Sequence, residues 1–374
     1  MVIKQIKSMS EVDAVSWNSL VENNDPFLRH EFLLALEQSG SVSIKTGWNP
    51  YHLLAFDGET LQAAMPLYLK SHSWGEYVFD QQWADAYYQS AMDYYPKWVN
   101  AIPFTPCQGQ RILMKQGINE QTVISLFIDT IQQLSELNNI SSFHCLFPNT
   151  TQTKLLEPSL LIREGVQFQW FNKDYQDFDD YLQTFSSRHR KKINKERRKI
   201  HEQEISLLRL SGLEISTQQW DVFFQFYELT YLKRGQEAYL NLDFFKQLAK
   251  TMPEQILLVL AIKENVYVGA ALSFIGENTL YGRYWGCYEE YNSLHFEACY
   301  YQGLEYCLEH NKQVFDSGAQ GEHKISRGFE PVSTYSAHWI QNPRLSRLIA
   351  NFLEREKNLI QHYKKDCTQQ LPFK

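Results

Sequence analysis

Two stretches decide the fold that the sequence predicts: LLAFDGETLQAAMPL (Leu53–Leu67) and VLAIKENVYVGAALS (Val259–Ser273). Each contains an apolar run, a polar turn and a second run that carries small residues. Asp57-Gly58 is a strong hairpin turn signal, and Glu264-Asn265 is a weaker one. Both stretches are therefore predicted β-hairpins, and their small residues would let another element or a ligand come close to the second strand.

The elements around the two hairpins follow the same order, which favours a duplicated unit over a chance likeness between two hairpins. Helical patterns precede each hairpin, and a strand, a helix and another strand follow it. Such a unit is an α/β layer around a mixed sheet. The predicted helices are Ser10–Val21, Arg29–Gln38, Glu120–Leu137, Trp220–Leu232, Leu242–Lys250, Leu294–His310 and Arg344–Tyr363, and the further strands are Ser142–Phe147, Val166–Phe171, Thr279–Cys287 and Gln313–Asp316.

The boundary between the two halves is predicted near residues 165–180. Gly165 precedes a strand-like run, and the acidic segment Asp174–Asp180 then starts a helix that continues through the basic residues of 186–201. Acidic residues suit a helix start because they complement the macrodipole. We therefore predict an N-terminal domain over 1–165 and a C-terminal domain over 166–374, with the active site and the last helix in the second.

Composition narrows the class of protein. The 374 residues are 44% hydrophobic, which is typical of a globular chain, and the net charge of −7 argues against a general nucleic-acid binder. The N-terminal sequence lacks the apolar core of a signal peptide, and no run approaches the ~20 apolar residues of a membrane span. The six cysteines are scattered without a CxxC pair, so we expect reduced thiols, a cytoplasmic location and no metal.

One segment departs from the acidic balance. SSRHRKKINKERRKIH (Ser186–His201) holds eight Lys or Arg and one acid, Glu196, and the rest of the chain has a net charge of −14. Such a cluster attracts phosphates, nucleic acid or anionic lipid head groups. The alternative, a helix face that is merely solvated, remains open.

A second segment combines glycines with ionisable side chains. The stretch FDSGAQGEHKISRGFEP (Phe315–Pro331) follows a predicted strand and contains three glycines together with Glu322, His323, Lys324 and Arg327. Glycines let the backbone approach a ligand, and an acid, an imidazole and two cations could bind an anion and move a proton. A solvated, charged hairpin loop is the alternative.

The element order resembles the acyltransferase fold of the GCN5-related N-acetyltransferases (GNAT), and two such halves in one chain resemble the Fem-type aminoacyl transferases. Four long segments resemble the hallmarks of the FemAB-like family, which is labelled peptidoglycan biosynthesis/recognition. The resemblance spans nearly the whole chain and implies an α/β fold of two tandem GNAT-like domains with acyl or aminoacyl transfer as the activity. The four segments are Gly75–Tyr88, Ser186–Ile200, Gly282–His310 and Gly318–Ile340.

The resemblance implies acyl-CoA or aminoacyl-tRNA as the donor and an amine of a small molecule or a cell-wall precursor as the acceptor. The turn Tyr288–Leu294, YEEYNSL, lacks the Gly-x-Gly-type loop that holds the pyrophosphate of coenzyme A in GNAT domains. This departure argues against coenzyme A. The coiled-coil arm of some Fem enzymes is also missing, and the basic helix is its nearest counterpart.

Acyl transfer to an amine requires a proton acceptor, stabilisation of an oxyanion and neutralisation of the leaving group. The resemblance places the donor beside the strand Tyr281–Cys287. At most one of His295 and Glu297 faces it, and Glu297 is the preferred base, although a carboxylate there could simply complement the helix dipole. His323 is a second base, and Lys324 or Arg327 would stabilise the oxyanion or bind a phosphate.

Further predicted contacts lie elsewhere in the chain. No serine or cysteine pairs convincingly with a base, so direct attack within a ternary complex is favoured over a covalent intermediate. A non-catalytic module that binds a phosphorylated cell-wall intermediate or nucleic acid through residues 186–201 is the alternative function. The predicted substrate-binding residues are Trp83, Asp85, Arg188, Lys191, Lys192, Arg283, Tyr284, Trp285 and Glu322.

Overall fold

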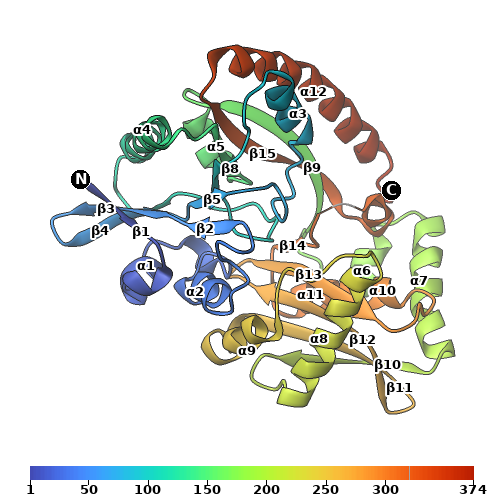
Figure 1. Ribbon diagram of the computed structural model, residues 1–374. Helices are drawn as coiled ribbons and strands as arrows, with labels where there is room; N and C mark the ends of the chain where they lie inside the picture. Colours follow the sequence, from blue (N-terminus) through green and yellow to red (C-terminus); the bar gives the residue numbers. More distant parts are fainter. Residues whose placement is uncertain (320) are drawn as a thin grey trace. The chain divides into compact units, whose positions relative to one another are not determined.

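The computed structural model describes residues 1–319 and 321–374 (Figure 1). Gln320, in the predicted glycine-rich loop, lies outside the described residues. Packing divides the chain into two compact units: unit 1 is Met1–Val166 with Ser333–Tyr363, and unit 2 is Gln167–Val332 with Lys364–Lys374. The domain division at residue 165 stays a prediction. The C-terminal helix, which the sequence places with the second domain, packs mostly within unit 1.

Unit 1 contains two sheets. One has the strand order β1-β3-β4-β7, and the other contains β8, β6, β5 and β2, with β15 pairing antiparallel to β8. The elements are β1 (Val2–Ile6), α1 (Ala14–Asn18), α2 (His30–Gln38), β2 (Trp48–Pro50), β3 (His52–Asp57), β4 (Thr60–Met65), β5 (Tyr68–Lys70), α3 (Gln81–Gln89), β6 (Lys97–Asn100), β7 (Leu113–Met114), α4 (Glu120–Asn138), β8 (Ser142–Leu146), α5 (Thr150–Leu156), β9 (Leu161–Phe171), β15 (Glu330–Ile340) and α12 (Pro343–Gln369), the last three of which continue into unit 2.

Unit 2 is built on the strand order β10-β11-β12-β13-β14-β9. Helix α8 packs on β12 and β13, and Figure 1 shows α8 and α9 together beside these strands. The elements are α6 (Phe178–Gln183), α7 (Ser187–Glu202), β10 (Ile205–Ser211), α8 (Thr217–Leu232), α9 (Leu242–Thr251), β11 (Ile256–Lys263), β12 (Val266–Ile275), β13 (Thr279–Cys287), α10 (Leu294–Phe296), α11 (Gln302–Glu309) and β14 (Val314–Asp316).

Both predicted hairpins are confirmed, and each has a shift in strand register at the corresponding position. In β3–β4, Ala55 pairs with Ala63 and the register shifts immediately after Ala55. In β11–β12, Ala261 pairs with Gly269 and the register shifts immediately after Ala261. These positions are 206 residues apart, which is the offset between the two sequence stretches. A β-bulge is a specific feature of a strand pair and not a general property of hairpins. Its repetition at the same offset therefore supports duplication of the unit.

Each unit also contains a parallel strand pair joined by a helix, which is the connection that parallel strands require. In unit 1, β6 pairs in parallel with β8, and α4 connects them. In unit 2, β13 pairs in parallel with β14, and α10 and α11 lie between them in the chain. The strand–helix–strand order that the sequence predicts after each hairpin is therefore confirmed.

Two predicted helices are wrong in detail. The helix that the sequence starts in the acidic segment and continues through the basic cluster is two helices, α6 and α7. Between them Phe185 forms a bridge with Phe373, and Ser186 N donates to Pro372 O at 2.9 Å. These backbone groups are therefore unavailable to a continuous helix. The first predicted helix is also shorter than expected, because the Asp13 side chain caps α1 by accepting from Ser16 N at 2.8 Å.

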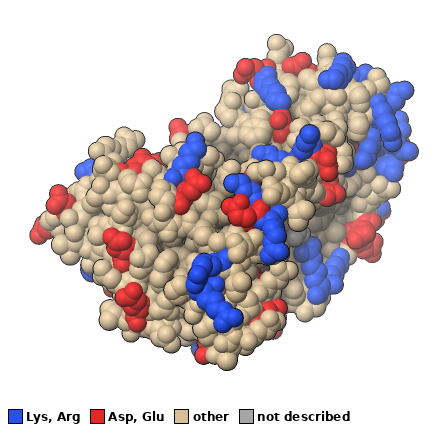
Figure 2. Space-filling model, turned by 90° about the horizontal axis from the view of Figure 1, so that it is seen from above, with Lys and Arg blue, Asp and Glu red and all other residues tan. Residues whose placement is uncertain are grey.

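Charged side chains of both signs are interspersed over the face shown in Figure 2. None of the helices in the described part of the chain is long and apolar enough to cross a membrane.

Candidate active site

The predicted site lies where β13 and β14 part. The two strands pair only over residues 279–281 and 314–316, while β13 continues beyond this pairing. After Asp316 the chain turns: Asp316 Oδ1 accepts from Gly318 N at 2.9 Å, and Gly318 has a φ of +83°, which glycine adopts without strain. The segment Glu322–Arg327 then forms a short 3-10 helix that carries the predicted loop residues.

Two histidines and a tyrosine lie together beside this short helix, and we call His295, Tyr300 and His323 the histidine cluster. The Tyr300 hydroxyl and His323 Nε2 are 2.8 Å apart. The centroid of the His295 ring is 5.9 Å from that of His323 and 5.4 Å from that of Tyr300. His323 is exposed, His295 is half-buried and Tyr300 is buried. In this cluster the buried Tyr300 hydroxyl orients the exposed imidazole of His323, and the half-buried His295 ring packs beside both.

Burial and neighbouring cations keep both imidazoles neutral. The pKa of His295 is lowered to about 4, first by burial and then by the positive charges of His323, Arg327 and Lys324. Burial also lowers the pKa of His323, with further lowering by Arg327, Lys324 and Lys192. At pH 7 both rings therefore carry a nitrogen lone pair that can accept a proton.

The histidine cluster depends on a π-helical turn, Glu297–Tyr301, inside the predicted helix 294–310. Such turns are rare and occur frequently at functional sites. Residues five apart, as His295 and Tyr300 are, point to different faces of an α-helix, but the wider turn brings these two rings together. Sequence reasoning missed Tyr300 because the α-helical period directs it away from His295.

Glu297, the preferred base of the sequence analysis, is buried in an ion pair. Its carboxylate oxygens accept from Arg197 at 3.1 and 3.2 Å and from Gln302 at 2.9 Å. Arg197 also donates to Glu305 at 2.7 Å. The base role of Glu297 stays a prediction, and this geometry gives its carboxylate a second task, which is to hold Arg197.

Arg327 is 2% exposed and has partners on every side. Its guanidinium donates to Glu196 at 2.8 Å, to the Tyr301 hydroxyl at 3.1 Å and to the His323 carbonyl oxygen at 2.7 Å. It also lies 3.5 Å from the centre of the Phe296 ring, within cation–π range. These contacts fix the backbone at His323, so Arg327 orients the histidine cluster through the His323 main chain.

Lys324 is buried beside the start of the loop. Its Nζ donates to Gly318 O at 2.7 Å and to Ser317 O at 3.1 Å. Both carbonyls belong to the turn that follows β14. Lys324 therefore ties the short helix to this turn, and its predicted contact with a donor or an oxyanion stays a prediction.

The other predicted residues of unit 2 differ in burial and in their distance from the histidine cluster. Trp285 is half-buried, and its ring lies 5.7 Å from the ring of His295. Tyr284 is buried beside Tyr227, at 5.1 Å between ring centres, and the Arg283 guanidinium lies 5.6 Å from the Tyr284 ring. Glu322 is exposed. Trp285 thus lies against the histidine cluster, and Glu322 precedes His323 on the same short helix.

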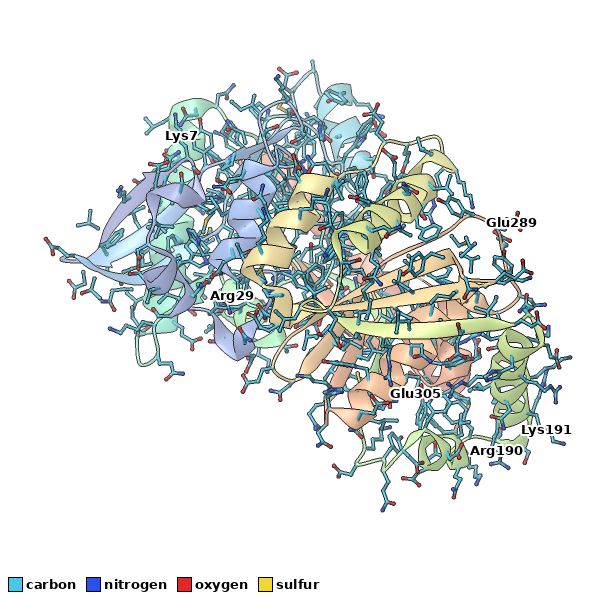
Figure 3. The ribbon with its side chains drawn as sticks, turned by 90° about the horizontal axis from the view of Figure 1, so that it is seen from below. Lys7, Arg29, Arg190, Lys191, Glu289 and Glu305 are labelled. Carbon is cyan, nitrogen blue, oxygen red and sulfur yellow. The ribbon has the colours of Figure 1, made fainter. Side chains whose placement is uncertain are left out.

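The remaining predicted residues belong to α3 of unit 1 and to α7 of unit 2, where Lys192 Nζ lies 3.5 Å from Ser326 Oγ on the short helix that carries His323. Trp83 is buried in unit 1, where its ring is 4.7 Å from that of His338, and Asp85 is exposed on α3. Arg188, Lys191 and Lys192 are exposed on α7. Figure 3 shows Lys191 and its neighbour Arg190 projecting from this helix.

The turn after β13 is acidic and lacks a phosphate cradle. Glu289 and Glu290 are both exposed there, and Figure 3 shows Glu289 at the outer edge of unit 2. Ser293, which precedes α10, has a φ of +68° and makes no side-chain cap. Two carboxylates would repel a pyrophosphate at this turn.

No group of three or more His, Cys, Asp or Glu is arranged to hold a metal ion among residues 1–319 and 321–374. An open hollow of about 570 Å³ lies elsewhere on unit 2. None of the predicted site residues lines this hollow, which is formed by Lys173, Tyr175, Asp180, Gln183, Thr184, Phe373 and Lys374.

The model of the FemAB-like family, described as peptidoglycan biosynthesis/recognition, matches residues 8–374. The chain belongs to the FemAB-like family. No curated protein matches the sequence. The fold is that of two tandem GNAT-like domains, which confirms the predicted fold class and family.

Three solved structures share this fold at low sequence identity. A crystal structure of FemX matches with a TM-score of 0.54 and 12% identity, covering 94% of this chain and 100% of that one. The C-terminal domain of a putative lysylphosphatidylglycerol synthetase from Agrobacterium fabrum matches with a TM-score of 0.56 and 7% identity, covering 91% and 95%. L-PGS from Bacillus licheniformis matches with a TM-score of 0.51 and 11% identity, covering 89% and 98%.

Proposed function

We propose that this FemAB-like protein transfers an acyl or aminoacyl group to an amine by direct attack, with His323 as the general base. The observation that carries the proposal is the His323 imidazole, which the Tyr300 hydroxyl holds at 2.8 Å and whose pKa is lowered by partial burial and by neighbouring cations. The family's description supports an amine of a peptidoglycan precursor as the acceptor.

As a base, His323 must carry its own proton on Nε2 and donate it to the Tyr300 oxygen, which leaves the lone pair of Nδ1 free. The acceptor nitrogen forms a bond to the donor's carbonyl carbon, and its proton passes to Nδ1. The C–O bond of an ester, or the C–S bond of a thioester, then breaks, and the leaving oxygen or sulfur takes up the proton from Nδ1, which restores the neutral imidazole. Gly321 keeps the ring edge open, because a Cβ at residue 321 would lie 2.7 Å from His323 Cε1.

Lys324 and Arg327 act in this proposal as positioning residues. Their hydrogen bonds hold the turn and the His323 backbone, and their charges lower the pKa of His323. Both effects favour a neutral, fixed imidazole at neutral pH. Neither role requires these cations to touch the donor.

For the donor we favour an aminoacyl ester carried on a polyanion over a coenzyme A thioester. The acidic turn at Glu289 and Glu290 disfavours a pyrophosphate, whereas α7 exposes a row of cations. Lys192 Nζ on α7 lies 3.5 Å from Ser326 Oγ, so this cationic face adjoins the short helix that carries His323. An aminoacyl-tRNA has both the polyanion and the ester that this arrangement would serve.

The test supplies purified protein with aminoacyl-tRNA or acyl-CoA labelled in the acyl group, together with a panel of amines, and measures labelled amide. We expect His323→Asn to lower the rate by about 10²–10⁴-fold, far more than the small loss of stability from leaving the buried Tyr300 hydroxyl without this partner. His310→Asn, a change of an exposed histidine immediately after α11, is the matched control. Full turnover in His323→Asn, or no product from either donor, would refute the proposal.

Binding without catalysis is the second candidate function, and the exposed cations of α7 favour it. Arg188, Lys191 and Lys195 follow one another at helical spacing on this helix. Binding of a polyanion there should weaken steeply with salt. Lys191→Glu with Lys195→Glu should abolish it, whereas Lys357→Glu, an exposed lysine on α12, should not; retained polyanion binding without any transfer would favour this candidate.

A further inference from the structure

A sheet of unit 1 has a polar face that is completely covered. Lys70 on β5 pairs directly with Lys97 on β6, and His144 on β8 pairs with His338 on β15. All four side chains are at most 1% exposed. The other face of these strands joins the apolar core through Trp98, Phe143, Cys145 and Ala337.

The segment 71–80 and helix α3 add acidic groups to this face. Glu76 and Asp80 are both buried, and Lys97 Nζ donates to Glu76 Oε2 at 2.8 Å, to Ser73 Oγ at 2.8 Å and to Asp80. We call residues 71–80 the strap, and we call Lys70, Glu76, Asp80, Tyr94, Lys97, His144 and His338 the polar layer.

Hydrogen bonds connect six residues of the polar layer, whereas Lys70 donates to the Trp74 carbonyl oxygen. The Tyr94 hydroxyl donates to Asp80 Oδ2 at 2.6 Å and lies 3.2 Å from His144 Nε2. His144 Nδ1 and His338 Nδ1 are 2.7 Å apart, so one of them donates a proton to the other. Well-packed apolar residues are often at least as stabilising as buried ion pairs. Stability alone therefore does not explain the polar layer.

Three polar atoms next to the strap lack partners among the described residues. Glu76 Oε1 and Asp80 Oδ1 have no donor, and Trp48 Nε1 has no acceptor. Native proteins leave few such buried atoms. All three N–H groups of Lys97 are already engaged, so it cannot serve these oxygens.

The unpartnered indole lies under the strap, beside Lys70. Trp48 Nε1 is 3.4 Å from the point where a Cβ on Gly75 would sit. Lys70 Nζ lies 3.7 Å from the centre of the Trp48 ring and donates to Trp74 O at 3.2 Å. Unused donors thus lie at Trp48 and Lys70, and unused acceptors lie at Glu76 and Asp80.

Asp80 does not cap helix α3 with its side chain, although it occupies the N-cap position. It is the N-cap residue of α3, a position where an aspartate side chain normally accepts from the helix's first N–H groups. Its side chain makes no such cap and turns inward to Lys97 and Tyr94. This orientation costs α3 its cap and directs a carboxylate into the polar layer.

We propose that the polar layer of unit 1 binds the ammonium and carboxylate groups of an α-amino acid. The ligand's ammonium would donate to Glu76 Oε1 and Asp80 Oδ1, and its carboxylate would accept from Trp48 Nε1 and Lys70 Nζ. A zwitterion fits a layer with two carboxylates and two lysines without adding net charge. A lone cation would leave the indole unpartnered, and a lone anion would leave both carboxylate oxygens unpartnered.

The strap is the element that opens for the ligand. It has no regular secondary structure, and the Trp74 and Phe79 side chains are 71% and 63% exposed, so they anchor it to no core. Hydrogen bonds from Lys70, Lys97 and Arg163 tie it to the sheet. Bound ligand would replace part of these ties and slow hydrogen exchange in the strap.

Calorimetry and ligand-observed NMR on the full chain test this site with free α-amino acids of different side-chain type. Two analogues of any binder are decisive: its N-acetyl form, which lacks the ammonium, and its primary amine, which lacks the carboxylate. We expect each analogue to bind about tenfold more weakly or worse. No binding of any amino acid at millimolar concentration, or an analogue that binds as tightly as its parent amino acid, overturns the proposal.

Variants locate the site independently of the proposed transfer. Glu76→Gln and Trp48→Phe should each weaken amino-acid binding about tenfold, whereas His323→Asn in unit 2 should leave it unchanged. If either unit 1 variant fails to fold, the analogue series on the unaltered protein still decides. Binding that persists in both folded variants would refute the assignment to the polar layer.

Discussion

The polar layer of unit 1 and the histidine cluster of unit 2 both adjoin a parallel strand pair joined by a helix, yet one is sealed and the other is open. Beside β6 and β8, Arg111 is fully buried and donates to Leu146 O at 2.6 Å and Gln110 O at 2.9 Å. After β14, the short helix instead presents His323 to solvent. The difference teaches that the segments packed over the strand pair, more than the pair itself, decide whether ionisable groups are enclosed or exposed.

The largest effect should come from removing a charged side chain from the polar layer of unit 1. Lys97→Met leaves Glu76 and Asp80 buried without their counter-ion, so we expect a loss of about 3–5 kcal/mol in the free energy of unfolding. Urea unfolding measures it. Lys45→Met, at an exposed lysine of the same unit, is the control. Equal midpoints for the two variants would show that the polar layer does not depend on this ion pair.

A smaller effect should separate the two readings of Glu297. Glu297→Gln keeps oxygen and shape but removes the charge that faces Arg197, so we expect a loss of about 1–2 kcal/mol in stability and an unchanged transfer rate. Urea unfolding and the labelled-amide assay measure the two quantities. A large loss of rate with little loss of stability would instead make Glu297 the base that the sequence predicts.

The sealed region should also show opposite responses at its two carboxylates. Burial raises the pKa of Glu76 to about 7, against an ordinary value of 4.5. Ionised Glu76 therefore opposes folding fully above pH 7 and not at all below about pH 4.5. We expect Glu76→Gln to stabilise by on the order of 1 kcal/mol at pH 7 and above, with the gain vanishing toward pH 4.5.

Asp80→Asn is the matched comparison. Although burial opposes ionisation, Lys97 and Tyr94 hold the pKa of Asp80 below its ordinary 3.8. Its ionised form therefore stabilises the fold above that value, and this stability is lost as pH falls through the lower, folded pKa. Thermal unfolding at several pH values checks both variants, and a loss of stability at pH 7 in Glu76→Gln would contradict the contrast.

The smallest effect concerns the open region. His323 must be neutral to act as a base, so the rate should rise with pH through its lowered pKa, below 6.5, and level off by neutral pH. Lys192 contributes to this lowering. Lys192→Gln should therefore shift the acidic limb of the pH–rate profile to slightly higher pH, and the shift should be smaller at high salt. Lys195→Gln on the same helix is the control, and an identical shift in both would point to a general surface-charge effect.

Local sequence signals account for much of the fold. Asp57-Gly58 marked the first hairpin, and the periodic apolar residues of 120–137 and 220–232 marked α4 and α8. The break at Phe185 escaped prediction because its cause is a bridge to Phe373, far away in the chain. Tyr300 escaped because a π-helical turn changes which residues share a face.

The sequence by itself determined the two duplicated hairpins, the α/β class, the family and the position of His323 in a glycine-containing loop. The hairpins and the class depend on periodicity and turn chemistry, which act between residues close in the chain, and the family depends on the resemblance of four long segments. Only the tertiary structure decided which charges are enclosed. The alternation in SFHCL and in SAHWI resembles a strand with one wet face, but the strap and α3 cover that face, and such coverage depends on contacts between distant segments.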